Sequence, residues 1–319
     1  MIRCLSLVLL VLLGLASAAV GEDYPTRAIR LVVGYSPGGG NDLIARIVAA
    51  RLQERLGQSV IVDNKPGAQS IVAAELVARA MPDGYTLLVA PSGPMTINPA
   101  VHARLSYSPE RDFAPISLLA EFPLLLAVGS DQPLRSVREL VEYGRAHPRA
   151  ANYGSSATPF QLAAELFNQR TGSAFQHVPY RGSGDVVQAV MAGQVLMAFV
   201  DSGPLAGPLK AGKVRALAMT GVQRSADFPD VPTFREQGLS DMEIALWTGL
   251  VAPAQTPAAI VDRLQQAIRL VLAEPETQAA LRAIAVEPRG STAEEYRALI
   301  ARDIARWKAV ATAANIKLE

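Results

Sequence analysis

Residues 31–42 read Leu-Val-Val-Gly-Tyr-Ser-Pro-Gly-Gly-Gly-Asn-Asp, an apolar run that leads into three glycines and then into a helix-forming segment. Gly38, Gly39 and Gly40 carry no Cβ, so their backbone can adopt positive φ and approach a ligand closely. The first N–H groups of the following helix have no partner inside the helix, and they attract an anion. The stretch therefore predicts a strand, a turn and a helix that cradle a negatively charged group. A tight connection without a ligand has the same pattern, so both interpretations stay open.

Short apolar runs alternate with helix-period segments from this turn to the C-terminus. The first expected helix carries apolar residues at helical spacing up to Leu56 and ends at Gly57, a residue type that favours a left-handed C-cap. Strands are expected at 59–63 and 85–90, and the second of them leads into Ser92. Parallel strands place their C-terminal loops at one edge of a sheet, so Ser92 is expected beside the glycine turn. This alternation predicts an α/β fold.

Three expected strands in the second half of the chain, at 151–153, 175–180 and 195–200, each lead into a polar loop. We expect these loops to form the opposite wall of a cleft. Their candidate binding residues are Ser155, Ser156, Thr158, Arg181, Gly182 and Asp201.

A long apolar run at 116–128, interrupted at Pro123, exceeds the other expected strands in length and is expected to cross between two lobes. Trp247 lies in a later apolar run, and we assign it to the core or the hinge. Three pairs have the spacing of a capping box and so mark expected helix starts: Ser136 with Glu139, Thr233 with Glu236, and Ser291 with Glu294.

The first 18 residues have the pattern of a secretory signal peptide, because Arg3 precedes an apolar run at 5–15 and the small residues Ala16-Ser17-Ala18. The run is shorter than the roughly 20 residues that a membrane-spanning helix needs. We therefore expect cleavage, export to the periplasm and a soluble mature protein. Cys4, the only cysteine, would leave with the leader.

The charge balance excludes some classes of function. The whole chain has 30 basic and 29 acidic residues, and removal of Arg3 leaves 29 of each, so the mature net charge is near zero with His neutral. A protein that binds nucleic acid usually has a basic footprint, so no nucleic-acid partner is expected. His102, His147 and His177 lie far apart in sequence and form no metal-spaced pair, so no metal site is expected.

Several short motifs, taken in order, resemble those of the tripartite tricarboxylate transporter substrate-binding family, the Bug receptors. They include Tyr24 to Arg30, Tyr35 to Asp42, Leu56 to Gln58, Asn64 to Ala68, Pro82 to Leu87, Asn98-Pro99, Asp112-Phe113, His177 to Gly182, Val214 to Ala218, Asp230 to Thr233, and Trp247 to Leu250. The resemblance implies a two-lobed Venus-flytrap fold, each lobe a mixed, mostly parallel sheet flanked by helices. It places residues 24–122 and 225–319 in the first lobe and residues 123–224 in the second.

The resemblance also implies the function. A receptor of this family encloses a small carboxylate, such as a dicarboxylate, a tricarboxylate, an aromatic acid or an acidic amino acid, and hands it to membrane permease subunits. We expect it to act as a monomer. By the family's pattern, the ligand would be held in the first lobe by Tyr35, Ser36, Gly38, Gly39, Gly40, Asp42 and Ser92, and in the second by Ser155, Ser156, Thr158, Arg181, Gly182 and Asp201.

The chain departs from the family's pattern in two binding loops. The segment from Ser155 to Leu162 is about two residues shorter than usual and lacks the usual glycines. The usual Gly-Ala-Gly-Gly is Gly67-Ala68-Gln69-Ser70 in this chain, where side-chain contacts would replace a close approach of the backbone. A changed ligand is consistent with both departures.

Most candidate residues also have a structural alternative. Asp42 can orient a bound water or cap the first helical turn, and the loop serines can donate to a carboxylate or bond their own backbone. Arg181 can pair with the acid or stay solvated. Asp201 can accept from a ligand amine or hydroxyl, or act as a cap. Tyr35 and Phe160 can pack on the ligand's carbon skeleton or fill the core.

The sequence bears on two other classes of function. An enzyme is disfavoured, because the glycine turn gives neither Gly-x-Gly-x-x-Gly nor the phosphate-loop pattern, and His-Glu-x-x-His does not occur. No catalytic residue and no cofactor are predicted. A periplasmic sensor that contacts a signalling receptor uses the same closed lobes, so it remains an alternative to a transport receptor.

Overall fold

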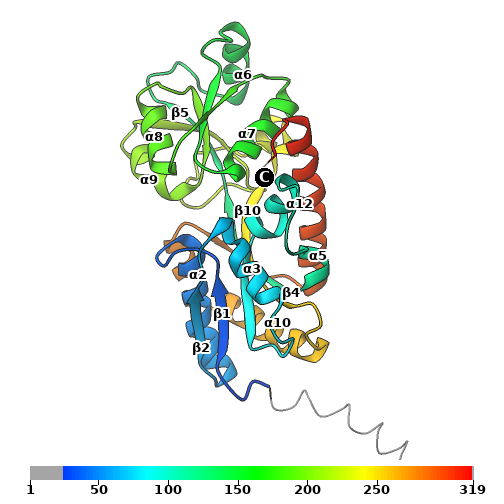
Figure 1. Cartoon of the computed structure of the whole chain (residues 1–319). Coiled ribbons are helices and arrows are strands. Elements are labelled where there is room, and N and C mark those ends of the chain that lie inside the picture. The colour runs from blue at the N-terminus through cyan, green and yellow to red at the C-terminus, as the bar shows by residue number, and fades with distance from the viewer. Residues whose placement is uncertain (1–23, 318–319) are drawn as a thin grey trace, which may run out of the picture.

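Strand β1 (Ile29–Val33) lies inside a sheet that has helices on both faces, as the computed structural model of residues 24–317 shows (Figure 1). Side chains alternate across a strand, so Leu31 and Val33 enter one hydrophobic core while Val32 enters another. A strand that is buried on both faces has a nearly continuous apolar sequence, and Leu31-Val32-Val33 in β1 fits this rule.

The first sheet has six strands in the order β11-β4-β10-β3-β1-β2. Strand β1 is parallel to both of its neighbours, whereas β10 runs antiparallel to β3 and β4, and β11 antiparallel to β4. The bounds are β2 (Val60–Asn64), β3 (Thr86–Pro91), β4 (Phe113–Pro123), β10 (Ala245–Pro253) and β11 (Glu287–Pro288).

Helices cover both faces of this sheet. Residues of α2 and α10 enter the core with Leu31, and residues of α3 and α12 enter the core with Val32. Helix α2 ends as predicted, because Gly57 adopts the left-handed conformation with φ 67° and its N–H donates to the Gln53 carbonyl. The helical elements are α2 (Gly40–Leu56), η2 (Ala68–Ser70), α3 (Ile71–Ala78), η3 (Gly93–Ile97), α4 (Asn98–Val101), α5 (Pro109–Asp112), α10 (Ala258–Ala273), α11 (Pro275–Ala283) and α12 (Ala293–Ala313).

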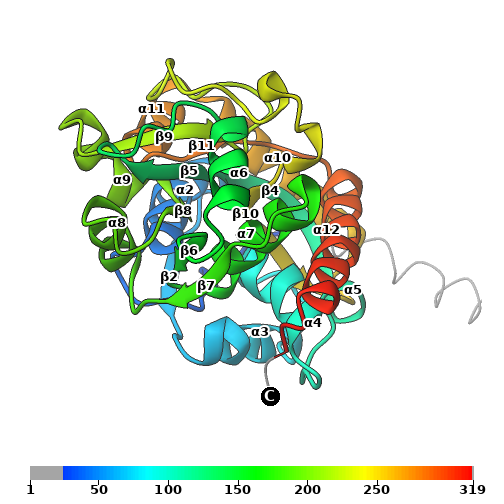
Figure 2. The ribbon, with the colours of Figure 1, turned by 90° about the horizontal axis from the view of Figure 1, so that it is seen from above.

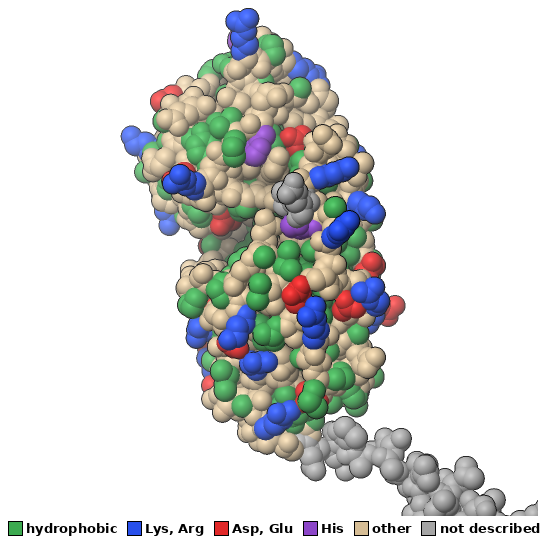
Figure 3. Space-filling model, in the orientation of Figure 1, with side chains coloured by type: hydrophobic (Ala, Val, Ile, Leu, Met, Phe, Trp, Pro, Cys, Tyr) green, Lys and Arg blue, Asp and Glu red, His purple; other side chains and the backbone are tan. Residues whose placement is uncertain are grey.

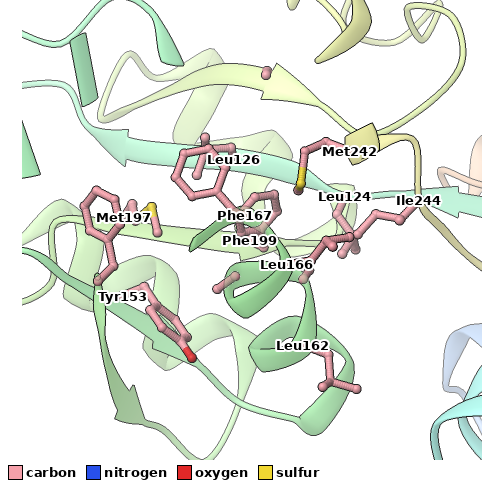
Figure 4. Close-up of a cluster of buried hydrophobic side chains, with 14 of the residues drawn as sticks. Leu124, Leu126, Tyr153, Leu162, Leu166, Phe167, Met197, Phe199, Met242 and Ile244 are labelled. Atoms are coloured by element: carbon pink, nitrogen blue, oxygen red, sulfur yellow. The ribbon is translucent and has the colours of Figure 1, made fainter. Parts of the chain in front are cut away.

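The second sheet has five strands in the order β7-β6-β8-β5-β9, and it forms the upper part of Figure 1. Its bounds are β5 (Leu125–Gly129), β6 (Asn152–Ser155), β7 (Gln176–Pro179), β8 (Met197–Val200) and β9 (Val214–Met219). Its helical elements are α6 (Val137–Ala146), α7 (Thr158–Thr171), α8 (Ser183–Met191), α9 (Ser202–Lys210), η4 (Arg235–Gln237) and η5 (Ser240–Met242). Figure 4 shows the core of this part, where Phe167 and Phe199 lie 5.8 Å apart between ring centroids.

Two extended segments connect the sheets. The chain leaves β4 through Leu124 and returns through Ile244 into β10. Thr220 joins them: its Oγ1 accepts from the Leu124 N–H at 2.9 Å, its N–H donates to the Leu124 carbonyl at 2.9 Å, and its carbonyl accepts from the Ile244 N–H at 3.2 Å. The expected crossing at Pro123 therefore lies beside the return strand, and this pairing forms the junction between the lobes.

Residues 225–243 were assigned to the first lobe, but Phe228 and Val231 pack in a core with β8 and β9, and Phe234 packs in a core with Phe167. We propose that the second lobe extends to Ile244. Helix α12 runs along one side of the molecule (Figures 1 and 2), and its residue Trp307 packs in the same core as Phe167.

The start predicted at Ser136 is confirmed, the one at Thr233 precedes only the short η4, whose N-cap is Phe234, and the last one is shifted. Ser136 accepts from the Glu139 N–H, and Thr233 and Glu236 form both bonds of a capping box. The last box is Thr292 with Glu295, one residue after the expected pair of Ser291 and Glu294, because the Ser291 side chain instead accepts from the Leu118 N–H.

The expected signal peptide at 1–18 lies outside the described residues. Among residues 24–317, none of the helices has the combination of length and hydropathy that a membrane crossing requires.

Candidate binding cleft

A cavity of about 660 Å³ opens between the two lobes, where the strands of both sheets end in loops. The surface is hollowed at this level in Figure 3, on the side away from α12. The residues that line it are Tyr35, Gly40, Asn41, Gln69, Pro91, Ser92, Gly93, Ile97, Asn98, Phe122, Ser156, Ala157, Thr158, Pro159, Phe160, Asp201, Leu246 and Trp247.

The glycine turn presents only its last residue to the cavity. Gly38 has a φ of 84°, which favours glycine, while Gly39 is the extended N-cap of α2 and Gly40 is the first helical residue and lines the cavity. The helix therefore begins at the cavity, as the sequence predicted, with the partial positive charge of its N-terminus at the wall.

Asp42 lies behind this wall and outside the cavity lining. Its carboxylate is 1% exposed and accepts from the Gly38 N–H at 2.8 Å, from Arg46 Nε at 2.9 Å and from Asn64 Nδ2 at 2.9 Å. Burial raises the pKa of this carboxyl, but the hydrogen bonds from Arg46, Gly38 and Asn64 outweigh burial and lower the pKa to about 2. Asp42 thus fixes the glycine turn, which is the structural one of its two expected roles.

Neutral donors line the rest of the first-lobe wall. The Tyr35 hydroxyl lies 3.0 Å from where a Cβ on Gly93 would be, and burial raises the pKa of Tyr35 to about 12, so it keeps its proton. Asn41 Oδ1 accepts from Thr248 Oγ1 at 2.5 Å, which leaves the amide N–H groups of Asn41 to donate. Ser92, at the end of β3, meets the glycine turn at the same cavity, as parallel strands require.

The second-lobe wall begins after β6. Ser155 does not line the cavity, because its Oγ bonds His177 Nε2 at 2.7 Å, and His177 stacks on Tyr153 with ring centroids 5.2 Å apart. Burial lowers the pKa of His177. Ser156 and Thr158 do line the cavity, and Ser156 Oγ lies 3.2 Å from Ser183 Oγ.

Helix α7 also begins at this cavity. Its N-cap is Ala157, which has no side chain that could accept a hydrogen bond from the first turn. The Thr158 N–H group is therefore available to a ligand, whereas Pro159 has no N–H to offer.

Asp201 is the one charged residue among the described residues that line the cavity. It is the N-cap of α9 without a capping hydrogen bond, and its Oδ1 is buried with no partner within residues 24–317. Burial raises the pKa of Asp201, and this effect exceeds that of the hydrogen bonds from its own N–H and from Ser183. A ligand O–H or N–H group could satisfy this carboxyl.

Arg181, Gly182, Ser36, Gly38 and Gly39 also lie outside the lining residues. Arg181 is exposed, and no Lys or Arg occurs among the described residues that line the cavity. Within residues 24–317, no three His, Cys, Asp or Glu side chains are grouped as metal ligands would be.

Apolar side chains complete the cavity, and sequence reasoning missed several of them. Phe122, Phe160 and Trp247 line it, so Phe160 and Tyr35 are placed where a ligand's carbon skeleton would pack. Trp247 was assigned to the core or hinge; it is buried, donates from Nε1 to Asp303 on α12 at 2.9 Å, and still forms part of the lining. Its position after the crossing into β10 was the signal that could have identified it.

Comparisons with known proteins give this geometry a context. The model of the tripartite tricarboxylate transporter family receptor, TctC, matches residues 44–316. BugT of Bordetella pertussis is 32% identical over 309 residues, which cover 96% of this chain and 95% of BugT. A UPF0065 protein of Pseudomonas sp. (strain P51) is 34% identical over 290 residues, which cover 90% of this chain and 86% of that protein.

Solved structures are similar over nearly the whole chain. Rpa4515 of R. palustris, with adipate, is 36% identical with a TM-score of 0.77, covering 92% of this chain and 99% of that one. MatC of Rhodopseudomonas palustris, with bound malate, is 31% identical with a TM-score of 0.73, covering 90% and 99%. The periplasmic binding protein BugD is 27% identical with a TM-score of 0.73, covering 93% and 100%. These similarities confirm the predicted two-lobed α/β fold.

Proposed function

Because this chain belongs to the receptor family of tripartite tricarboxylate transporters, a family of solute-binding receptors and not of enzymes, we propose that it captures a small carboxylate in the periplasm and delivers it to the membrane permease of such a transporter. The observation that carries the proposal is that helices from both lobes begin at one cavity. Gly40 starts α2 on one wall, and Thr158 starts α7 on the other. Helix N-termini bind carboxylates without a cationic side chain, which matches a lining without Lys or Arg.

On the first lobe, the ligand carboxylate would accept from the α2 N-terminus and from neutral donors. Ser92 and the Tyr35 hydroxyl are placed for this role, and Asn41 has N–H groups to spare. Ordered water can bridge the same groups at little cost in affinity. Ser36, Gly38 and Gly39 would then support the turn rather than contact the ligand.

On the second lobe, the far end of the ligand would meet Ser156, Thr158 and the α7 N-terminus. Asp201 would accept from a hydroxyl or ammonium group on the ligand. Relatives bind adipate and malate in their solved structures, and malate has such a hydroxyl whereas adipate has none. Both ligands are therefore informative probes of this chain.

The free energy of binding requires both walls. A micromolar dissociation constant corresponds to about 8 kcal/mol, whereas one helix N-terminus supplies roughly 0.3–2 kcal/mol. Apolar contact with Phe122, Phe160 and Trp247 and several hydrogen bonds must add to the helix ends. We infer that the lobes close on the ligand by bending at the paired segments around Leu124 and Thr220.

The proposal is tested with protein that lacks the expected signal peptide at 1–18, in a thermal-shift panel of adipate, malate, succinate, citrate, aspartate and glutamate, with glucose and maltose as neutral controls. At least one carboxylate should raise Tm, and calorimetry should then give one site per monomer. Shifts with the sugars alone would refute carboxylate binding. Capture of permease subunits by the liganded protein supports delivery to a transporter, and capture of a signalling receptor in their place refutes it.

A further inference from the structure

The backbone from Gly67 to Ser70 has positive φ at four consecutive residues. The values are 147° at Gly67, 44° at Ala68, 53° at Gln69 and 70° at Ser70. Elsewhere in residues 24–317, Ala285 and Asn315 are the non-glycine residues with positive φ, and each stands alone. Residues with a Cβ are strained in this region, whereas glycine adopts it freely. Three strained residues in a row must be held by their surroundings.

The neighbouring structure holds this segment firmly. Asn98, which is buried, donates from Nδ2 to the Gln69 carbonyl at 3.1 Å. Ser70 is also buried and packs against Gly34, where an added Cβ would lie 1.8 Å from Ser70 Oγ. Gly34, the residue after β1, therefore leaves room for Ser70, and Asn98 fixes the peptide of Gln69.

This backbone places Gln69 in the lining of the cleft, on the same wall as Tyr35 and Ser92. The side chain is exposed, and its carboxamide makes no hydrogen bond within the described residues. Within residues 24–317 the strained backbone at Gln69 is therefore held through its carbonyl, and the Gln69 side chain adds no hydrogen bond of its own. Glycine would be more stable there, and the resemblance noted above has a glycine at this place.

We propose that Gln69 is a specificity-determining residue of the cleft, whose carboxamide N–H donates to a carboxylate oxygen of the bound ligand. This rests on the proposed function. The ligand group must be an acceptor for the amide N–H, and an ionised carboxylate accepts shorter and stronger hydrogen bonds than a neutral oxygen does. Strain retained at a binding site, against local stability, is a recurrent feature of functional positions.

Three variants separate the side chain from the strain. Gln69→Ala removes the carboxamide and keeps the strain, and Gln69→Gly removes both. Ala68→Gly is the matched control, because Ala68 has a φ of 44° and is exposed but does not line the cavity. The probe is the carboxylate that gives the wild-type chain its largest thermal shift in the panel above.

Calorimetry with this probe should show Kd weakened about tenfold in both Gln69 variants and unchanged in Ala68→Gly. Tm without ligand should rise in Gln69→Gly and Ala68→Gly and stay unchanged in Gln69→Ala. A Kd within twofold of wild type in Gln69→Ala overturns the proposal, as does a lower Tm in Gln69→Gly. If the wild-type chain binds no carboxylate, the proposed function itself fails, which is a result distinct from either of these.

Discussion

Replacement of Asp42 by Asn tests whether this carboxylate stabilises the glycine turn. Asn is isosteric and can still accept from the Gly38 N–H, but it loses the ion pair with Arg46, and its NH2 group faces the Asn64 Nδ2 that donates to the native carboxylate. The native carboxyl has a pKa of about 2 against an ordinary value of 3.8, a difference of nearly two units. At 1.36 kcal/mol per unit this corresponds to roughly 2.5 kcal/mol. Arg46 is half exposed, and solvent screens the pair, so we expect Asp42→Asn to cost about 1–2 kcal/mol of unfolding free energy at pH 7.

The pH dependence gives the sharper test. The pKa of Asp42 is lowered on folding, so its contribution is present in full above pH 3.8 and is lost as the pH falls through about 2. The difference in unfolding free energy between wild type and Asp42→Asn should be constant from pH 7 to pH 5 and fall to roughly half at pH 3. Taking the difference cancels the titration of groups that both proteins share.

Urea unfolding followed by circular dichroism measures this difference. Asp262→Asn is a suitable control, since Asp262 is exposed and makes no ion pair in the described structure. A difference for Asp42→Asn that does not change between pH 7 and pH 3 would refute the electrostatic account. A variant as stable as wild type at pH 7 would show that the ion pair and its hydrogen bonds contribute nothing net.

Three further predictions concern the cleft and the junction. Gly40→Ala adds a Cβ that contacts only Phe122, at 3.9 Å, so it should fold normally but weaken carboxylate binding about tenfold, whereas Gly39→Ala, outside the lining, should bind like wild type in calorimetry. Asp201→Asn removes a buried carboxylate, and burial raises the pKa of this carboxyl, so the variant should have a higher Tm than wild type at pH 7 but not below pH 3.8. It should also bind adipate more tightly in calorimetry, and weaker adipate binding would contradict this. Thr220→Val leaves the Leu124 N–H without its Oγ1 acceptor, so urea unfolding should show a loss of about 1–3 kcal/mol.

Local sequence rules predicted much of the fold because the interactions behind them are local. The left-handed C-cap at Gly57 and the cap at Ser136 each depend on residues within one turn. The last helix shows where such rules stop. Ser291 has the right spacing, but Leu118, far away in the chain, donates to its hydroxyl, and Thr292 caps the helix instead.

The cleft was predicted less completely for the same reason. Ser155 ends strand β6 at the correct edge, but His177, on the neighbouring strand, bonds its hydroxyl. The register between β6 and β7 brings His177 to Ser155, and this register cannot be predicted from the sequence. Asp42 likewise lies outside the cavity lining, where it accepts a hydrogen bond from Asn64 at the end of a different strand, β2.

Because Ser155 does not line the cavity, the residues that select the ligand should be sought elsewhere. The short loop after β6 pointed to the second lobe, and residues 156–160 do line the cavity, but none of them is charged. Asp201, after β8, is the residue of the described lining that distinguishes between ligands by charge. On the first lobe, the strained backbone at Gln69 places a free carboxamide in the lining. The two groups make opposite demands, because Asp201 needs a donor and the Gln69 N–H needs an acceptor. A ligand that meets both has a carboxylate on the first-lobe side and a hydroxyl or ammonium group facing the second, so aspartate and malate should bind more tightly than succinate, and equal affinities for the three would argue against this division of roles.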